Sequence, residues 1–220
     1  MAPMVELLLI RHGETAWNAE RRMQGHLDIG LNTTGLAQAE ALGAALRTEA
    51  LDAIHTSDLL RATQTAAALC ADRALPLQRD AALRERCFGI FEGLLYADLA
   101  ASHPEPYRAW QARELDARYP PGTNTAETLR EFSARCLAAI NRIASAAAVA
   151  GQRRVALVTH GGVLECAYRA ATRTALGAER DFAILNASVN RLAWTAQGLQ
   201  ILEWADVRHL QAAARDEIDG

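Results

Sequence analysis

The sequence predicts an α/β fold with three layers, in which a mostly parallel central sheet carries helices on both faces. Three observations support this prediction. Short apolar runs that fit buried strands alternate along the chain with longer segments of helical periodicity. Two of these runs end at a histidine followed by glycine, where a strand would turn into a helix. The last patterned segment alternates polar and apolar residues around Gln197 and Gly198, which is typical of a β-hairpin.

The first half of the chain supplies three of the expected strands. The apolar run Val5–Ile10 is bounded by a glycine and fits a strand covered on both faces. Asn32 and two threonines then offer helix caps, and apolar residues follow at helical spacing: Leu36, Ala39, Leu42 and Leu46. Leu51–Ser57 and Leu75–Asp80 read as further strands, with a helix expected over Leu59–Arg73 between them.

The middle of the chain, residues 85–125, is the least regular part. Four prolines interrupt it: Pro104, Pro106, Pro120 and Pro121. Such a segment fits short helices and loops that cover a site. Asn124 and Glu127 have the spacing of a capping box and are expected to open a long helix. The buried stripe of this helix would be Leu129, Phe132, Cys136, Ile140, Ile143 and Ala147.

The second half repeats the opening pattern. Arg153–Gly162 is a β-branched run that stops at a histidine and glycines, and Val163–Thr174 is expected to be helical. Ser188–Ala205 forms the expected hairpin. Because the sequence has no internal repeat, low-complexity segment or linker, residues 1–220 are expected to fold as a single domain. Residues 215–220 are expected to form a frayed tail.

Composition and charge exclude several classes of function. The chain has 220 residues, a formal net charge of −3 and no cluster of basic residues, which argues against a nucleic-acid partner. Its apolar runs stay well below the ~18 residues of a membrane span, and the N-terminus lacks the features of a secretion signal. The four cysteines form no CxxC pair, which fits reduced thiols in a cytoplasmic protein.

The two strands that end in His-Gly place reactive side chains at one edge of the sheet. Ligands of open α/β sheets bind outside the carboxyl ends of the strands, where His12 and His160 both lie. Arg11 adjoins His12, and Arg61 opens the helix after another strand. Arginine pairs with phosphate oxygens in bidentate fashion and keeps its charge at any relevant pH. If the two strands are neighbours, the sequence predicts a pocket for a phosphate dianion without a metal.

Five segments carry a resemblance to a known family. They are, in chain order, LLLIRHGETAWN, QGHLDIGLNTTGLAQA, TSDLLRATQTA, LRERCFGIFEG and VTHGG. In this order they resemble the histidine phosphatase superfamily, which includes the cofactor-dependent phosphoglycerate mutases and many phosphomonoesterases. The resemblance extends from about Val5 to Glu165 and implies a phosphoglycerate mutase-like fold.

The resemblance implies a role for each of the main site residues. His12 is the implied nucleophile, which forms a phosphohistidine. Arg11, Arg61 and His160 are implied to hold the transferring oxygens, and a bound dianion favours the charged form of His160. Glu85 is the implied general acid, which protonates the leaving alkoxide and then activates the water that releases phosphate.

Other residues of these segments have more local interpretations. Glu92 is the rival of Glu85 for the acid role, although a brace of the loop is the favoured interpretation. His26 with Asp28 could be a metal pair, but the sequence shows no third ligand, so no metal site is predicted. Ser57 is left open as either a phosphate contact or a turn former. The resemblance implies further phosphate contacts from Asn18, Gln24, Gly25 and Gly161.

Departures from the mutase pattern favour hydrolysis. The cofactor-dependent mutases read HGN and QGL where this chain has THGG and FEGLL, and they carry a longer insertion with paired arginines. The expected activity is therefore metal-independent hydrolysis of a small phosphorylated metabolite. A phosphoglycerate mutase that uses 2,3-bisphosphoglycerate is the alternative, and an inactive phosphate-binding module is the second. No other cofactor is expected. The expected partner is a small phosphate ester, with a homodimer left open and neither nucleic acid nor membrane.

Overall fold

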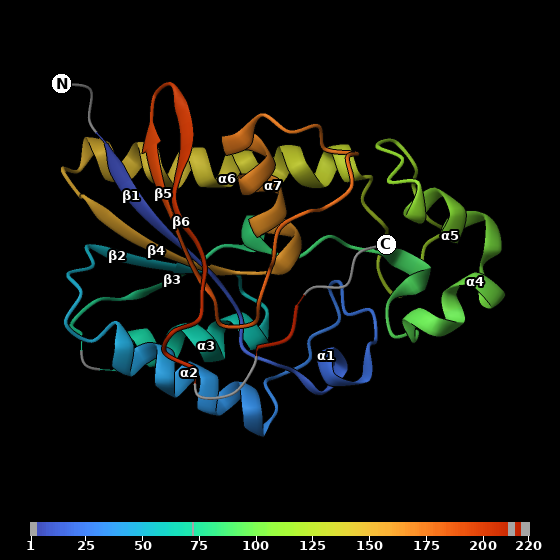
Figure 1. Ribbon diagram of the computed structural model, residues 1–220, viewed down its shortest axis with the longest axis horizontal. Helices are drawn as coiled ribbons and strands as arrows, with labels where there is room; N and C mark the ends of the chain where they lie inside the picture. Colours follow the sequence, from blue (N-terminus) through green and yellow to red (C-terminus); the bar gives the residue numbers. More distant parts are fainter. Residues whose placement is uncertain (1–3, 72, 211–213, 217–220) are drawn as a thin grey trace.

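The computed structural model describes residues 4–71, 73–210 and 214–216. Within these residues, six strands form one sheet in the order β3-β2-β4-β1-β5-β6 (Figure 1). The strands are β1 (Val5–Arg11), β2 (Ala53–Thr56), β3 (Leu77–Arg79), β4 (Arg154–Thr159), β5 (Val189–Thr195) and β6 (Gly198–Asp206). β1 pairs in parallel with β4, as β2 does with β3 and β4, whereas β5 is antiparallel to β1 and to β6. The sheet is mixed: the four predicted parallel strands lie next to one another, and the hairpin of β5 and β6 forms one edge.

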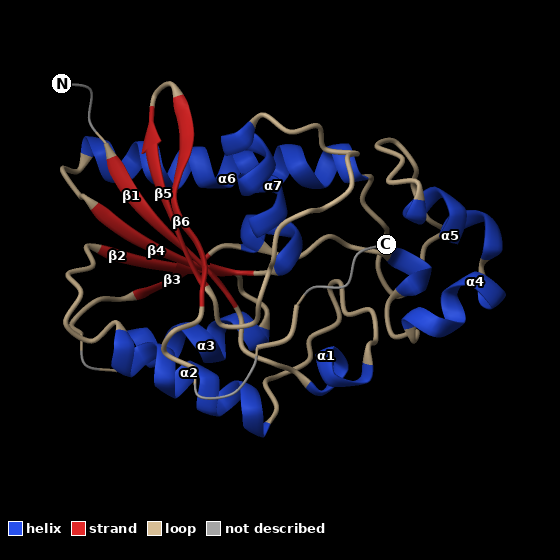
Figure 2. Ribbon diagram, in the orientation of Figure 1, coloured by secondary structure: helices blue, strands red, loops and turns tan. Residues whose placement is uncertain are grey.

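Alternating residues of β1 explain why helices cover both faces of the sheet. Leu7 and Leu9 are buried with α6 and α7 on one face, whereas Leu8 and Ile10 pack with α2 and α3 on the other. These helices are α2 (Thr33–Ala45), α3 (Leu60–Cys70), α6 (Leu129–Val149) and α7 (Gly161–Thr172). Figure 2 shows one pair of helices on each side of the strands. The predicted three-layer α/β/α arrangement is confirmed.

The long helix α6 buries the stripe that its spacing predicts. All six residues of that stripe are buried: Leu129, Phe132, Cys136, Ile140, Ile143 and Ala147. Glu131 and Arg142 lie on its exposed face. The helix is therefore amphipathic, with its apolar side against the sheet. No helix in the described part of the chain combines the length and the apolarity needed to cross a bilayer.

The predicted start of α6 is wrong. Its N-cap is Thr128, whose hydroxyl accepts the N–H of Glu131 at 3.1 Å while the Glu131 carboxylate accepts the N–H of Thr128 at 2.9 Å. Asn124, the predicted cap, instead donates to Glu92 at 2.9 Å. Two consecutive segments, residues 124–127 and 128–131, match a capping box here. The true cap is the one that meets the free N–H groups of the first turn.

Residues 85–125 form a lobe of short helices beyond the carboxyl ends of the parallel strands (Figure 1). The short helices of the described chain are α1 (Ala16–Glu20), η1 (Ala81–Leu83), η2 (Gly89–Phe91), η3 (Tyr96–Asp98), α4 (Leu99–Ser102) and α5 (Pro104–Gln111). The lobe has an apolar cluster of its own, which includes Phe91, Leu99 and Tyr119. This cluster fixes side chains of the lobe over the end of the sheet.

Two residues of the predicted tail are held by the fold. The Nε of Arg215 donates to Oε2 of Glu14 at 2.7 Å, and the Arg215 carbonyl oxygen accepts from Arg11 at 3.2 Å. The Asp216 carboxylate accepts the N–H of Ile184 at 2.7 Å. The expectation of a frayed tail is wrong for these two residues, because they supply acceptors to donors of the core. Residues 217–220 lie outside the described part of the chain.

Candidate active site

The ends of β1 and β4 bring two histidines together. These strands pair in parallel with Arg11 opposite Thr159, so the residues that follow, His12 and His160, leave the sheet side by side. Their ring centroids are 5.2 Å apart, and the rings meet at 60°. Both side chains are buried, His12 with 3% of its surface exposed and His160 with none. The predicted meeting of the two imidazoles is confirmed.

A backbone bond fixes which nitrogen of His12 carries the proton. Nδ1 lies 2.7 Å from the carbonyl oxygen of Gly13, which can only accept, so Nδ1 is the donor. In the neutral ring, Nε2 is then left with a free lone pair. Burial lowers the pKa of His12 well below its usual value, and the charges of Arg61 and Arg11 lower it further. His12 is therefore neutral at physiological pH, with its basic nitrogen available.

His160 is held by a second strand end. Its Nε2 lies 2.8 Å from Oγ of Ser57, the residue that follows β2. Among the described residues, its Nδ1 has no hydrogen-bond partner. Burial lowers the pKa of His160 well below its usual value, with further contributions from Arg61 and His12. The lowered pKa favours a neutral ring, and its charging by a bound dianion stays a prediction.

Arg61 ties the first turn of α3 to the loop that follows α1. Its Nη2 donates to the carbonyl oxygen of Gly25 at 2.8 Å, and its Nη1 donates to that of Leu27 at 3.0 Å. The side chain is almost fully buried. A buried guanidinium next to two imidazoles makes this end of the site strongly favourable for an anion.

Glu85 approaches the start of α7. One of its carboxylate oxygens accepts the N–H of Arg86 at 2.7 Å, and the other accepts the N–H of Gly162 at 3.0 Å. A Cβ at position 162 would collide with this carboxylate and would lie 2.9 Å from the Phe132 ring. Glycine is therefore required at position 162 for Glu85 to reach the helix.

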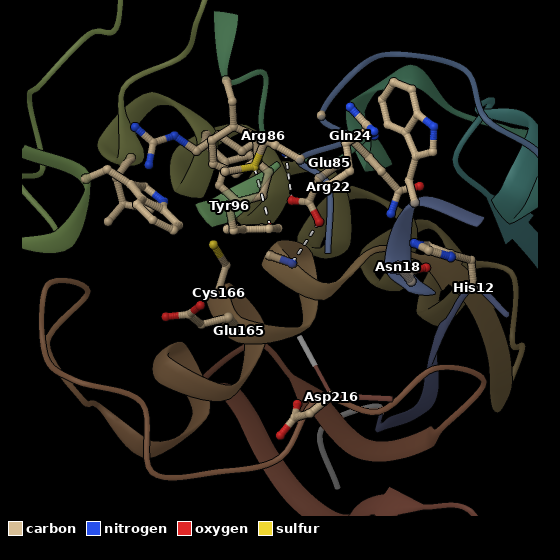
Figure 3. Close-up of a pocket in the computed structure, with 18 of the residues that line it drawn as sticks. His12, Asn18, Arg22, Gln24, Glu85, Arg86, Tyr96, Glu165, Cys166 and Asp216 are labelled. Carbon is tan, nitrogen blue, oxygen red and sulfur yellow. Dashed lines mark hydrogen bonds between the residues drawn. The ribbon is translucent and has the colours of Figure 1, made fainter. Parts of the chain in front are cut away.

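A cavity of about 100 Å³ joins these groups. Six of the nine predicted site residues line it: His12, Asn18, Gln24, Gly25, Arg61 and Glu85. In Figure 3, Glu85 lies between His12 on one side and Arg86 and Tyr96 on the other. The cavity thus has a phosphate end at His12 and a second end beyond Glu85.

Three of the predicted residues are buried and are not among the described residues that line this cavity. The guanidinium of Arg11 is turned to the carbonyl oxygen of Ile184, at 2.7 Å. The ring of His160 lies between Ser57 and His12. Gly161 is the first residue of α7, and the next residue, Gly162, lines the cavity and donates its N–H to Glu85. The predicted phosphate contact of Gly161 stays a prediction.

Thr15 holds the side chains of Asn18 and Gln24 at the cavity. Asn18 accepts from the Thr15 N–H at 3.1 Å and donates its own N–H to the Thr15 hydroxyl, which closes a capping box on α1. The Thr15 hydroxyl also lies 2.9 Å from Oε1 of Gln24. Local hydrogen bonds therefore hold both amides in place at the phosphate end.

Glu92, the alternative to Glu85, binds the backbone of a loop, and His26 and Asp28 also bind backbone groups. Glu92 accepts the N–H groups of His26, at 2.9 Å, and Phe88, at 3.1 Å. The interpretation of Glu92 as a loop brace is confirmed. The Nε2 of His26 is 2.8 Å from the carbonyl oxygen of Glu85, and Asp28 accepts the N–H of Leu60 at 2.6 Å. His26 and Asp28 are thus engaged separately, each with backbone.

The second end of the cavity was not predicted in detail. The rest of the lining combines aromatic, aliphatic, basic and acidic side chains, including Trp17, Arg22, Met23, Arg86, Phe88, Tyr96, Trp110, Arg113, Glu165 and Asp216. Five of these ten residues come from the lobe of residues 85–125. Their convergence depends on the fold of the lobe, and its one local signal is the adjacency of Arg86 to Glu85.

Comparison with known proteins agrees with this geometry. The sequence model of the histidine phosphatase superfamily (branch 1) matches residues 7–207. Phosphoglycerate mutase-like protein 4 of Arabidopsis thaliana is 39% identical over 216 residues, which cover 94% of this chain and 87% of that protein. The metal-independent phosphoserine phosphatase of the same plant is 35% identical over 211 residues, which cover 95% of this chain and 84% of that protein.

A solved structure shows the same fold. YhfR of Bacillus stearothermophilus matches this chain with a TM-score of 0.82 and 32% sequence identity. The match covers 93% of this chain and 98% of YhfR. Like the sequence matches, this structural match covers nearly the whole chain. Together with the two histidines at neighbouring strand ends, these matches establish that the chain belongs to the histidine phosphatase superfamily.

Proposed function

We propose that this protein hydrolyses small phosphate monoesters through a phosphohistidine on His12, without a metal ion. The observation that carries the proposal is the orientation of His12. Its Nδ1–H is turned to Gly13, so the neutral ring keeps a lone pair on Nε2 at a cavity that also contains Arg61 and Glu85. A nucleophile, a fixed cation and a carboxyl group in one small cavity are the parts that phosphoryl transfer to histidine requires.

In the first step, Nε2 of His12 attacks phosphorus in line with the ester oxygen. The N–P bond forms, the P–O ester bond breaks, and its electron pair leaves on the alkoxide oxygen. Glu85 donates its proton to that oxygen, so the product that leaves is an alcohol. The negative charge of the bound phosphate next to Glu85 favours the protonated carboxyl that this step needs.

In the second step, water attacks the phosphohistidine. Glu85, now a carboxylate, takes a proton from the water as the new O–P bond forms. The P–N bond breaks, and its electron pair returns to Nε2. Inorganic phosphate leaves, and both His12 and Glu85 regain their starting protonation states.

Cations and N–H groups balance the charge of the transferring group. Arg61 and the charged form of His160 are the proposed partners of the phosphoryl oxygens, with Arg11 in support at the end of β1. The pKa of His160 is lowered by burial and by Arg61 in the ligand-free protein, so a dianion is needed to charge it. The positive charge on His160 would therefore form only when the phosphate group of the substrate is bound, and it would then act together with that of Arg61.

The names of the relatives support two related activities. The metal-independent phosphoserine phosphatase supports hydrolysis of a small ester without a metal. The phosphoglycerate mutase-like relative supports transfer between two hydroxyl groups as the alternative. Arg86 in the cavity wall favours a leaving group with an anionic substituent, whereas Arg113 is paired with Glu165.

A direct test measures phosphate release in the presence of EDTA. Phosphoserine, 3-phosphoglycerate and 4-nitrophenyl phosphate are offered separately, and 3-phosphoglycerate is also offered with 2,3-bisphosphoglycerate. We expect phosphate release that EDTA leaves unchanged. Isomerisation of 3-phosphoglycerate that outruns phosphate release would establish the mutase alternative. Absence of turnover, together with tight phosphate binding, would identify the chain as a binding module.

A further inference from the structure

Arg135 lies in the second turn of α6 and forms a two-pronged ion pair with Glu127. Its Nε donates to Oε1 of Glu127 at 2.7 Å, and its Nη2 donates to Oε2 at 2.7 Å. Both side chains are largely buried. Burial alone would lower the pKa of Arg135, but the hydrogen bond to Glu127 raises it above its usual value. The pair is therefore fully charged and geometrically fixed.

The same guanidinium also binds the backbone that leads to Glu85. Its Nη1 donates to the carbonyl oxygens of Ala82, at 2.9 Å, and Arg84, at 3.1 Å. Its Nη2 donates to the carbonyl oxygen of Glu85 at 3.1 Å. One side chain thus holds three carbonyl groups within four consecutive residues.

Glu127 holds the backbone on the other side of Glu85. Its Oε2 accepts the N–H of Cys87 at 3.0 Å, and its own N–H donates to the Cys87 carbonyl oxygen at 3.0 Å. Its carbonyl oxygen accepts from Nε of Arg86 at 3.1 Å. Arg135 therefore holds the loop before Glu85, and Glu127 holds it after Glu85. An ion pair joins these two residues.

A second donor acts on the carbonyl oxygen of Glu85. The carbonyl oxygen that accepts from Arg135 lies 2.8 Å from Nε2 of His26. Since a carbonyl oxygen only accepts, Nε2 of His26 is a donor there. None of these three residues is needed to cap a helix or to extend the sheet. Arg135 and His26 bind the Glu85 carbonyl oxygen, and Glu127 binds the two residues that follow it.

We propose that Arg135, with Glu127, is a positioning residue that sets the position of the Glu85 carboxyl relative to the leaving-group oxygen. The inference rests on the proposed function, in which Glu85 transfers the proton. Proton transfer requires heavy atoms at hydrogen-bond distance, and a displacement of about 1 Å can reduce a rate by about 10²-fold. Glu85 lies in a loop without secondary structure of its own. Bonds from other elements are therefore needed to keep its carboxyl group within that distance.

The leaving group separates this role from a merely structural one. An ester with a good leaving group, 4-nitrophenyl phosphate, departs without protonation, whereas an alkyl ester such as glycerol 3-phosphate needs the acid. Misplacing Glu85 therefore slows the first step for the alkyl ester and spares it for the aryl ester. A general loss of folded protein would lower both rates by the same factor.

The test compares kcat for the two esters in wild type, Arg135→Gln and Arg135→Lys. We expect Arg135→Gln to lower the kcat ratio of alkyl to aryl ester by about 10-fold or more, within the range of a general-acid contribution. Arg135→Lys keeps the charge but loses the two-pronged geometry and should recover the ratio only in part. Dephosphorylation of the phosphoenzyme is followed separately by quenched flow, because Glu85 also acts in that step.

Arg130→Gln is the matched control. Arg130 lies on the same helix and forms a similar two-pronged pair with Asp116, at 2.7 and 2.9 Å, but it is exposed and contacts residues away from Glu85. Its removal should leave the ratio within about twofold of wild type. If Arg135→Gln does not fold, Glu127→Gln replaces it, because this change keeps the size of the side chain and removes its charge.

The outcomes distinguish this inference from the proposed function. An unchanged ratio in a folded Arg135→Gln or Glu127→Gln protein would overturn the positioning role while leaving the hydrolase assignment intact. An equal loss on both esters, together with an unchanged rate of dephosphorylation in the folded protein, would assign Arg135 to stability alone. A wild-type protein that hydrolyses neither ester would reject the proposed function itself.

Discussion

The Glu85 carboxylate accepts the backbone N–H of Gly162 in the first turn of α7. This bond joins the loop that carries the proposed acid to the helix that begins after His160. Because α7 continues from β4, the acid is placed relative to the same sheet edge that places both histidines. A loop, a helix N-terminus and two strand ends therefore form one rigid frame around the cavity.

Replacing Gly162 should disturb this frame. In Gly162→Ala the new methyl group meets the Glu85 carboxylate and the Phe132 ring, so one of them must move. We expect kcat for alkyl esters to fall by about 10-fold to 10²-fold, because the acid is displaced. Gly177→Ala is the control, since a Cβ there has ordinary contacts of 3.4 and 3.6 Å. Equal activities of the two variants would contradict the frame.

Removal of His12 should abolish chemistry. In His12→Ala the nucleophilic nitrogen is missing, so kcat should fall by about 10³-fold or more and no phosphoprotein should form. Acid-labile labelling from 4-nitrophenyl phosphate carrying ³²P measures the phosphoprotein. Glu85→Gln provides the contrast, because it should still be labelled by this substrate and should lose the label slowly. Labelling of the His12→Ala protein would move the nucleophile elsewhere.

The proton affinity of His12 should be unusually low. Burial lowers its pKa, and the positive charges of Arg61 and Arg11 lower it further, so the ring should stay neutral well below pH 6.5. NMR titration of ¹⁵N-labelled histidines in the ligand-free protein measures this, with His12→Gln used for assignment. In Arg61→Gln one positive charge is lost, and the midpoint should rise. A His12 midpoint at 6.5 or above in wild type would refute the electrostatic description.

The same burial predicts how stability depends on pH. The folded pKa values of His12 and His160 lie below the usual value of 6.5, so the unfolded chain binds more protons as the pH falls below about 6.5. The free energy of unfolding is therefore highest above that pH and should decrease from pH 7.5 to 5.5. Urea denaturation measures the decrease. It should be smaller in His160→Gln, and an equal decrease there would show that the buried ring contributes nothing.

The two histidines were predictable because their placement follows from strand periodicity and chain order. An apolar run that ends at Arg11 and another that ends at Thr159 can each be recognised locally. A parallel sheet then puts both carboxyl ends at one edge. The sequence could not show that β1 and β4 are neighbours. The helices that connect the strands indicate a parallel sheet, so this adjacency was the one remaining assumption.

The second end of the cavity was not predictable, because it depends on contacts between distant segments. Tyr96 and Trp110 face the cavity only because the lobe packs on Phe91 and Tyr119. The bonds of Arg135 to three carbonyl groups have no signature in the local pattern of α6. Periodicity indicates which face of a helix is buried, but it does not indicate which loop a polar residue on that helix will bind.

The return of Arg215 and Asp216 to the site has a practical consequence for preparing the protein. Asp216 lines the cavity, and the carbonyl oxygen of Arg215 accepts from Arg11. A purification tag fused directly after Asp216 would begin at the edge of the cavity. Val5 begins β1 at the opposite end of the sheet, so an affinity tag attached ahead of it leaves the opening clear (Figure 1).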